Sequence, residues 1–164
     1  MKTHIIEDFA EKEAIIRSCK HCIVSTVDKD GMPYSVPMNF GYYDNRIILH
    51  SAPTGSHLQN IEYNNRVCIV FCTDGTLVYQ HKEVACSYRM QAKSVICFGK
   101  VHFIESDEEK EATMNKFMAQ YTQNEFKYSK PAIRNVKVWI VEIEKMTAKA
   151  FAVPHKKTIT VRRP

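Results

Sequence analysis

Three strand-like segments follow one another closely in the first third of the chain, and this succession limits the fold more than any other feature. The segments are residues 21–27, 33–40 and 46–50, and the turns between them are Asp30-Gly31 and Tyr43-Asp44-Asn45. Asp-Gly is a typical hairpin turn, and Asp and Asn favour turns. Connections this short permit antiparallel pairing but leave no room for the crossover helix that parallel strands need. The sequence therefore predicts an antiparallel sheet.

The remaining elements alternate short helices with single strands. The predicted helices lie within residues 7–19, at 56–64 and after Ser106. The last of these is amphipathic and places Met114, Phe117, Met118 and Tyr121 on one face. The predicted strands are an apolar one at 66–72, a long one at 90–104 with a bend at Gly99, and one at 136–144 that ends near Lys145. Residues 74–87 show no clear period, which predicts a loop or an irregular hairpin.

This order predicts a mainly β fold. Tight early hairpins and only short helices between later strands favour a closed or partly closed β-barrel with peripheral helices over a doubly wound parallel sheet. A length of 164 residues with 45% hydrophobic content fits one domain with a core of about residues 8–150 and a basic tail at 151–164.

The chain has no apolar window of membrane-spanning length and no signal-peptide-like N-terminus, so we expect a cytoplasmic protein. Its six cysteines are then expected to be reduced thiols. Cys19-Lys20-His21-Cys22 has the spacing of a zinc or redox pair but no second pair of ligands. Because Cys22 opens a strand, core packing is favoured and no metal site is predicted.

The basic tail carries His155-Lys156-Lys157 and Arg162-Arg163. Such a tail suits an anionic partner, but it is more often simply solvated. Stacking platforms for nucleic acid need aromatic side chains interleaved with basic ones, whereas Tyr34 and Tyr42-Tyr43 have few basic neighbours. We therefore predict no nucleic-acid partner.

The stretch from Pro37 to Leu58 is the best candidate for a binding site, because two strands end and one helix begins within it. GxGxxG, P-loop, GxSxG and HExxH motifs are all absent. The unpaired N–H groups of a helix N-terminus attract phosphate, and this turn adds donors from Ser51, Thr54, Ser56 and His57. On spacing alone, a phosphate site and an ordinary capped turn are equally supported.

Several runs in the same order resemble one known superfamily. They are Gly31 to Phe40, Ile48-Leu49-His50-Ser51-Ala52, Gly55, Asn65-Arg66-Val67-Cys68, Ser94 to Val101, the Glu-rich helix after Ser106, and the strand Val138 to Ile143. This pattern is similar to the flavin-binding split barrels of the pyridoxamine-phosphate-oxidase-like superfamily, in particular the branch associated with 5-nitroimidazole resistance. Pyridoxamine phosphate oxidases proper are a poorer match, because their Arg-x-His is missing here.

The resemblance implies a single six-stranded antiparallel FMN-binding split-barrel domain that forms a homodimer with the cofactor, FMN or else FAD, between the subunits. The residues that it assigns to the cofactor form a ring-lining segment, a ribityl and phosphate turn, and two outlying positions. They are Pro37, Met38, Asn39 and Phe40 for the ring, His50, Ser51, Ala52, Thr54, Gly55, Ser56, His57 and Leu58 for the turn, Ser94 from the partner, and Trp139, for which core packing is the alternative.

The implied function is an FMN-dependent oxidoreductase. NAD(P)H would reduce the flavin, which would pass electrons to a small electron-poor acceptor such as a nitroimidazole. His50 is the one candidate proton donor, with a structural hydrogen-bonding role as the alternative. A second hypothesis is a flavin- or haem-binding protein of the same fold without turnover.

One position departs from the family pattern. Relatives often carry Lys in the phosphate turn where this chain has His57. Imidazole has an ordinary pKa of about 6.5, so it carries only part of a positive charge at neutral pH. Cofactor binding is therefore expected to depend on pH through His57.

Overall fold

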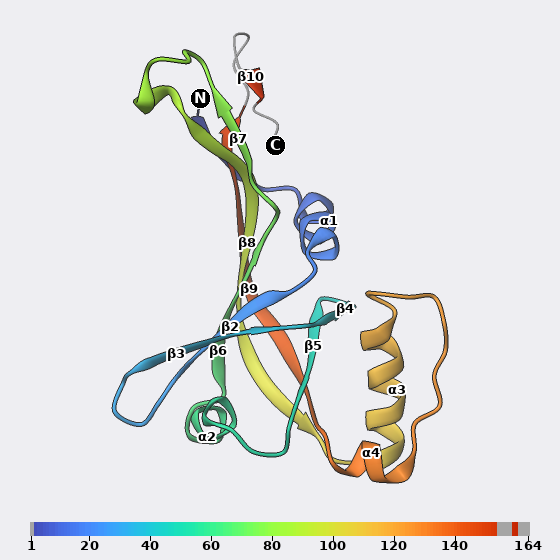
Figure 1. Cartoon of the computed structure of the whole chain (residues 1–164). Coiled ribbons are helices and arrows are strands. Elements are labelled where there is room, and N and C mark those ends of the chain that lie inside the picture. The colour runs from blue at the N-terminus through green and yellow to red at the C-terminus, as the bar shows by residue number, and fades with distance from the viewer. Residues whose placement is uncertain (1, 154–158, 161–164) are drawn as a thin grey trace. The chain divides into compact units, whose positions relative to one another are not determined.

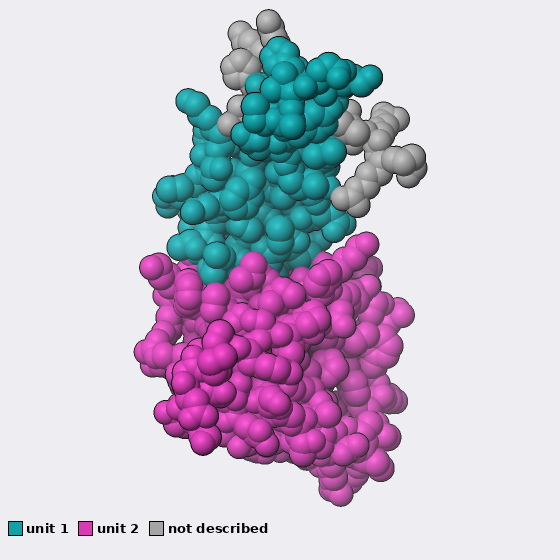
Figure 2. All heavy atoms as spheres, turned by 60° about the vertical axis from the view of Figure 1, so that its left-hand side comes forward, with its two compact units in different colours: residues 1–19, 71–96, 147–164 teal, residues 20–70, 97–146 magenta. Residues whose placement is uncertain are grey.

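The computed structural model describes residues 2–153 and 159–160, which divide into two compact units. One unit comprises residues 1–19, 71–96 and 147–164, and the other comprises residues 20–70 and 97–146 (Figure 2). We call them unit 1 and unit 2. Both are assembled from separate chain segments, so no single boundary in the sequence divides them. The basic side chains of the tail lie outside the described residues, and the single domain stays a prediction.

The described residues form ten strands and four α-helices (Figure 1). The strands are β1 (Lys2–Ile6), β2 (Cys22–Val27), β3 (Pro33–Met38), β4 (Gly41–Tyr43), β5 (Arg46–Ser51), β6 (Arg66–Cys72), β7 (Thr76–Tyr79), β8 (Arg89–Ile104), β9 (Lys137–Val153) and β10 (Ile159–Thr160). The helices are α1 (Phe9–Ser18), α2 (Ser56–Tyr63), α3 (Asp107–Met118) and α4 (Lys130–Arg134), with a 3₁₀ turn at Ala85–Ser87. The main sheet runs in the order β3-β2-β6-β8-β9-β5-β4. The mainly β prediction is confirmed, with ten strands in place of six.

In unit 2, β2 and β3 form the predicted hairpin, which pairs from Cys22 with Met38 to Val27 with Pro33. The carboxylate of Asp28 accepts hydrogen bonds from the N–H groups of Asp30 and Met32, at 2.8 and 2.9 Å. Gly31 has a φ of +82°, which a side chain would strain. The turn chemistry read from the sequence thus closes this hairpin.

Strand β4 was not predicted, because three residues are too few to show a strand pattern. Gly41 pairs with Ile48 of β5, and Asp44 and Asn45 both adopt positive φ in the turn between these strands. Asn and Asp tolerate that conformation better than other side chains. A Cβ on Gly41 would lie 2.5 Å from the Cα of Phe117, so glycine lets β4 approach α3 closely.

The predicted amphipathic helix after Ser106 is confirmed as α3, which lies beside β4 and β5 (Figure 1). Ser106 caps it by accepting a hydrogen bond from the N–H of Glu109. Met114 and Phe117 pack with Ile48 of β5 and Val138 of β9 in one buried cluster. The helix ends at Met118, so Tyr121 lies beyond it. The short α4 was not predicted.

In unit 1, two regions contain more strand than the sequence analysis predicted. Strand β9 continues to Val153 instead of ending near Lys145, and its second half pairs with the unpredicted β1, Ile6 opposite Ala148. Three residues of this segment are alanine, a poor strand former, and pairing with β1 supports the strand here. Residues 74–87 contain β7, which pairs with β8. Among the described residues, no helix is long and apolar enough to cross a membrane.

Candidate functional site

Thirteen of the fourteen predicted cofactor residues lie in unit 2, and Ser94 lies on β8 in unit 1. Within unit 2, the end of β3 leads directly into β4, and β4 pairs with β5. The residue Gly41, one after Phe40, is opposite Ile48, two residues before His50. The segment that follows β3 is therefore brought beside β5 through β4, although β3 itself lies at the other end of the sheet order, and α2 begins a few residues after β5.

The turn between β5 and α2 is open to an anion. No side chain caps α2, and the N–H groups of Leu58 and Gln59 donate to the carbonyl oxygen of Gly55. The N–H groups of Ser56 and His57 are then the free ends of the helix, where the helix dipole favours negative charge. The exposed hydroxyls of Thr54 and Ser56 have no hydrogen-bond partner among the described residues. This turn fits a phosphate group.

Gly55 is required at the start of this turn. Its φ is +152°, and a Cβ there would lie 2.9 Å from the imidazole ring of His57. A side chain would therefore both strain the backbone and push the ring away. The backbone conformation and the nearby imidazole ring therefore both favour glycine at position 55 of the predicted phosphate turn.

His57 turns inward instead of toward solvent. Its ring is nearly parallel to that of Trp139, with centroids 6.3 Å apart. Its Nε2 atom is buried and has no hydrogen-bond partner among the described residues, and burial lowers the pKa of this imidazole. The neutral imidazole is therefore favoured without a ligand. A bound anion would raise the pKa of His57 and so favour its protonated, positively charged form.

His50 and Trp139 project to opposite faces of the sheet. His50 is opposite Val138 and its ring meets the edge of Phe117, with centroids 4.8 Å apart, so it faces α3. Leu49 is opposite Trp139, and residues directly opposite share a face. Burial lowers the pKa of His50. The predicted proton donor therefore packs against an aromatic ring where burial disfavours its protonated form, and its catalytic role stays a prediction.

Three of the predicted cofactor residues are core side chains. Phe40 and Trp139 are fully buried and Leu58 is nearly so. For Trp139, this packing matches the alternative weighed from the sequence. Pro37, Asn39, Ala52, Thr54 and Ser56 are exposed, and the rest are half-buried.

One residue of this region was missed by the sequence analysis. The hydroxyl of Tyr121 accepts a hydrogen bond from the N–H of Phe40 at 2.9 Å and lies 3.4 Å from Nδ2 of Asn39. It donates to the carbonyl oxygen of Lys20 at 3.2 Å. The helical spacing indicated a core position for Tyr121, but α3 ends three residues earlier. Because Tyr121 lies just beyond the end of α3, the helical spacing does not predict where its side chain points.

The two cysteines of the Cys19-x-x-Cys22 pattern are both buried thiols. Sγ of Cys19 donates to the carbonyl oxygen of Ile15 in unit 1, and Sγ of Cys22 donates to that of Met38 in unit 2. Burial raises the pKa of Cys19, which disfavours the reactive thiolate. These positions agree with the core packing favoured from the sequence.

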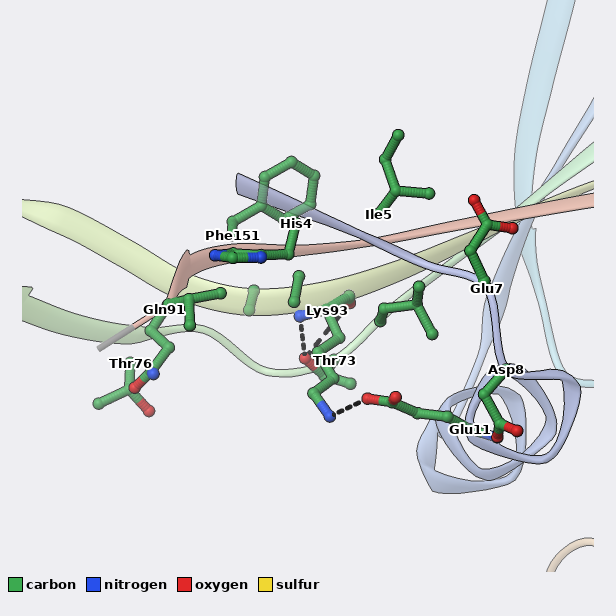
Figure 3. Close-up of a pocket in the computed structure, with 14 residues that line it drawn as sticks. His4, Ile5, Glu7, Asp8, Glu11, Thr73, Thr76, Gln91, Lys93 and Phe151 are labelled. Carbon is green, nitrogen blue, oxygen red and sulfur yellow. Dashed lines mark hydrogen bonds and ion pairs between the residues drawn. The ribbon is translucent and has the colours of Figure 1, made fainter. Parts of the chain in front are cut away.

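A cavity of about 640 Å³ lies in unit 1 (Figure 3), and none of the fourteen predicted residues lines it. Its titratable lining includes Glu7, Asp8 and Glu11 against one ammonium, that of Lys93, which is 2.7 Å from Glu11. Three carboxylates against one cation disfavour a phosphate. The cavity is therefore unsuited to the anionic end of a flavin nucleotide, in contrast to the turn before α2.

Comparison with known proteins identifies the family of this chain. The family model for pyridoxamine 5'-phosphate oxidase matches residues 9–150. A solved structure from Bacteroides thetaiotaomicron VPI-5482, assigned to 5-nitroimidazole antibiotic resistance, is 47% identical with a TM-score of 0.83, covering 91% of this chain and 87% of that chain. None of the curated proteins is a match.

Two more distant structures share the fold. The flavocytochrome Anf3 from Azotobacter vinelandii is 16% identical with a TM-score of 0.79, covering 98% of this chain and 80% of that chain. An FAD- and heme-binding protein from Mycobacterium smegmatis is 13% identical with a TM-score of 0.80, covering 98% and 84%. With its family match and its close relative, this chain belongs to the pyridoxamine 5'-phosphate oxidase-like family, in the branch related to 5-nitroimidazole resistance proteins.

Proposed function

We propose that the protein binds FMN and uses it as a reductase. The observation that carries the proposal is the turn before α2, where an uncapped helix N-terminus and two unpaired hydroxyls meet at Gly55. Ser56 and His57 would hold the phosphate through their N–H groups, with Thr54 and Ser56 adding hydroxyl donors. The end of β3 would support the ring. FAD is the alternative cofactor.

When bound, the flavin supplies hydride and electron transfer. The chain's own residues would orient it and shield it from water, and hydride transfer requires no side-chain acid. NAD(P)H is the proposed donor. The acceptor is proposed to be a small electron-poor molecule such as a nitroimidazole, by analogy with the relative assigned to resistance against that class. A flavin- or haem-binding protein without turnover is the competing function.

The test begins with the ligand that the natively purified protein releases, identified by mass spectrometry. The protein is then mixed with NADH or NADPH without oxygen. Bleaching of the flavin absorbance, followed by reoxidation when a nitroimidazole is added, is the expected result. A flavin spectrum that neither nucleotide bleaches would support the binding protein, and a Soret band would support haem.

We also propose that the protein is a homodimer with the cofactor between its subunits. On β2, Ile23 and Val27 point to the same face of the sheet and are 36% and 39% exposed, and Phe98 on β8 is 43% exposed. Val27 and Phe98 line one cavity of about 270 Å³ in unit 2. Exposed apolar side chains that cluster in this way are typical of an interaction surface.

Phe98→Glu is expected to weaken the dimer by at least about 100-fold, because association would bury a carboxylate. Analytical ultracentrifugation over a concentration series measures this change. Tyr63→Glu, at an exposed aromatic on α2, is the matched control and should sediment like the wild type. A Phe98→Glu protein with the wild-type dimer constant would remove this face from the interface.

FMN affinity is expected to fall from pH 6 to pH 8 more steeply in the wild type than in a His57→Lys variant. Burial lowers the pKa of free His57, whereas a bound phosphate raises it. Binding therefore takes up a proton, so affinity falls as pH rises from the free pKa toward the bound one. Fluorescence titration with FMN, and with riboflavin as the phosphate-free control, measures both slopes. Equal slopes would exclude His57 from the phosphate site.

A further inference from the structure

The polarity of the hydrogen bonds at the end of β3 is determined by one carbonyl group. The backbone oxygen of Lys20 only accepts hydrogen bonds, so the phenol proton of Tyr121 is donated to it, at 3.2 Å. The phenol oxygen is then an acceptor, and the N–H of Phe40 donates to it at 2.9 Å. Tyr121 thus binds both the segment before β2 and the end of β3.

This polarity orients the side-chain amide of Asn39. Its Nδ2 lies 3.4 Å from the oxygen of Lys20 and 3.4 Å from the phenol oxygen of Tyr121, so both neighbours require a donor at this position. A flipped amide would bring its oxygen against the carbonyl oxygen of Lys20, and two acceptors repel each other. The orientation of the Asn39 amide therefore follows from its two hydrogen-bond partners.

With the amide in this orientation, Oδ1 is the group of Asn39 that can bind a ligand. Both contacts of Asn39 use Nδ2, and its Oδ1 accepts no hydrogen bond from the described residues. Asn39 is exposed and lies in the segment expected to line the cofactor ring. The end of β3 thus presents a hydrogen-bond acceptor, and it would present donors if the amide were reversed.

We propose that Asn39 Oδ1 accepts a hydrogen bond from a ring N–H of the bound flavin and that Tyr121 is the residue that positions it. The inference rests on the proposed FMN binding and adds the residues that recognise the ring. The oxidised flavin ring has one N–H, at N3, between two carbonyl groups. An acceptor selects for that N–H, whereas a reversed amide would place a donor against it.

FMN and its N3-methyl analogue form the matched pair of ligands for the test, because methylation replaces this one donor hydrogen by a methyl group and leaves the rest of the molecule unchanged. Each is titrated by flavin fluorescence into the wild type, Tyr121→Phe, Asn39→Leu and a Tyr63→Phe control. We expect the wild type and the control to prefer FMN by about tenfold, since one hydrogen bond of about 1.4 kcal/mol corresponds to tenfold. Both site variants should lose most of this preference while they bind the methylated analogue as the wild type does.

The outcomes separate the inference from the function on which it rests. A wild type that binds neither flavin would overturn the proposed function and this inference with it. A wild type that binds FMN, with the same preference in Tyr121→Phe, would overturn the inference alone. Because Tyr121 and Asn39 are exposed, both variants are expected to fold, and a thermal midpoint close to that of Tyr63→Phe checks this. A uniform loss of affinity for both ligands would indicate a merely structural role and would also overturn the inference.

Discussion

Replacing Gly99 with alanine is expected to lower the free energy of unfolding by about 3 kcal/mol or more. A Cβ at this position of β8 would overlap the carbonyl oxygen of Glu142 and would lie 2.9 Å from Cγ1 of Val141. Both belong to β9, which is the neighbour of β8 in the sheet. Because the first of these atoms is backbone, the clash cannot be relieved by a side-chain rotation. The two strands would have to separate, at the expense of their hydrogen bonds.

Gly75→Ala is the matched control for this prediction. A Cβ there would also come within 2.5 Å of another atom, but that atom is Cγ of Met90, a flexible side chain that is 45% exposed. Methionine can move aside, so the expected loss is below about 1 kcal/mol. Urea unfolding followed by circular dichroism measures both variants. Similar losses would show that backbone contact is not what makes Gly99 irreplaceable.

The second large effect is expected at the phosphate turn, where Gly55→Ala should lower FMN affinity by at least about 100-fold, or 2.7 kcal/mol. The substitution strains a backbone with φ of +152° and pushes a methyl group against the ring of His57. Both effects distort the N-terminus of α2, whose N–H groups are proposed to hold the phosphate. Fluorescence titration of the folded variant measures the loss.

Riboflavin, which lacks the phosphate, distinguishes a local effect from a general one. Its affinity should change far less than that of FMN in Gly55→Ala. Gly31→Ala supplies the matched protein control, because Gly31 also has positive φ but has no neighbouring atom within 4 Å of its Cβ position. That variant should lose some stability and keep its FMN affinity. Equal losses for FMN and riboflavin in Gly55→Ala would place the phosphate elsewhere.

Elements with local signals were predictable from the sequence. The hairpin of β2 and β3 depends on Asp28 and Gly31, which lie within the turn itself. The helix α3 depends on the cap at Ser106 and on the spacing of Met114 and Phe117. In both cases the residues that form the element are close in the sequence, so their pattern is sufficient.

Elements that depend on a distant partner were not predictable. The second half of β9 contains three alanines, at positions 148, 150 and 152, and it is a strand that pairs with β1. Strand β4 is only three residues long and is held by β5 and α3. Both strands are stabilised by contacts with residues that are far away in the chain, so the local sequence pattern does not predict either strand.

In the candidate site, too, some features follow from local sequence and others from contacts between distant residues. The sequence by itself determined the antiparallel class, the family resemblance and the turn from Ser51 to His57, because turn residues, helix starts and motif order are local properties of the chain. Only the tertiary structure decided that His50 faces Phe117, that the ring of His57 lies over Trp139, and that Tyr121 orients Asn39. The direction of a side chain depends on which strands and helices surround it, and that depends on contacts between residues distant in sequence.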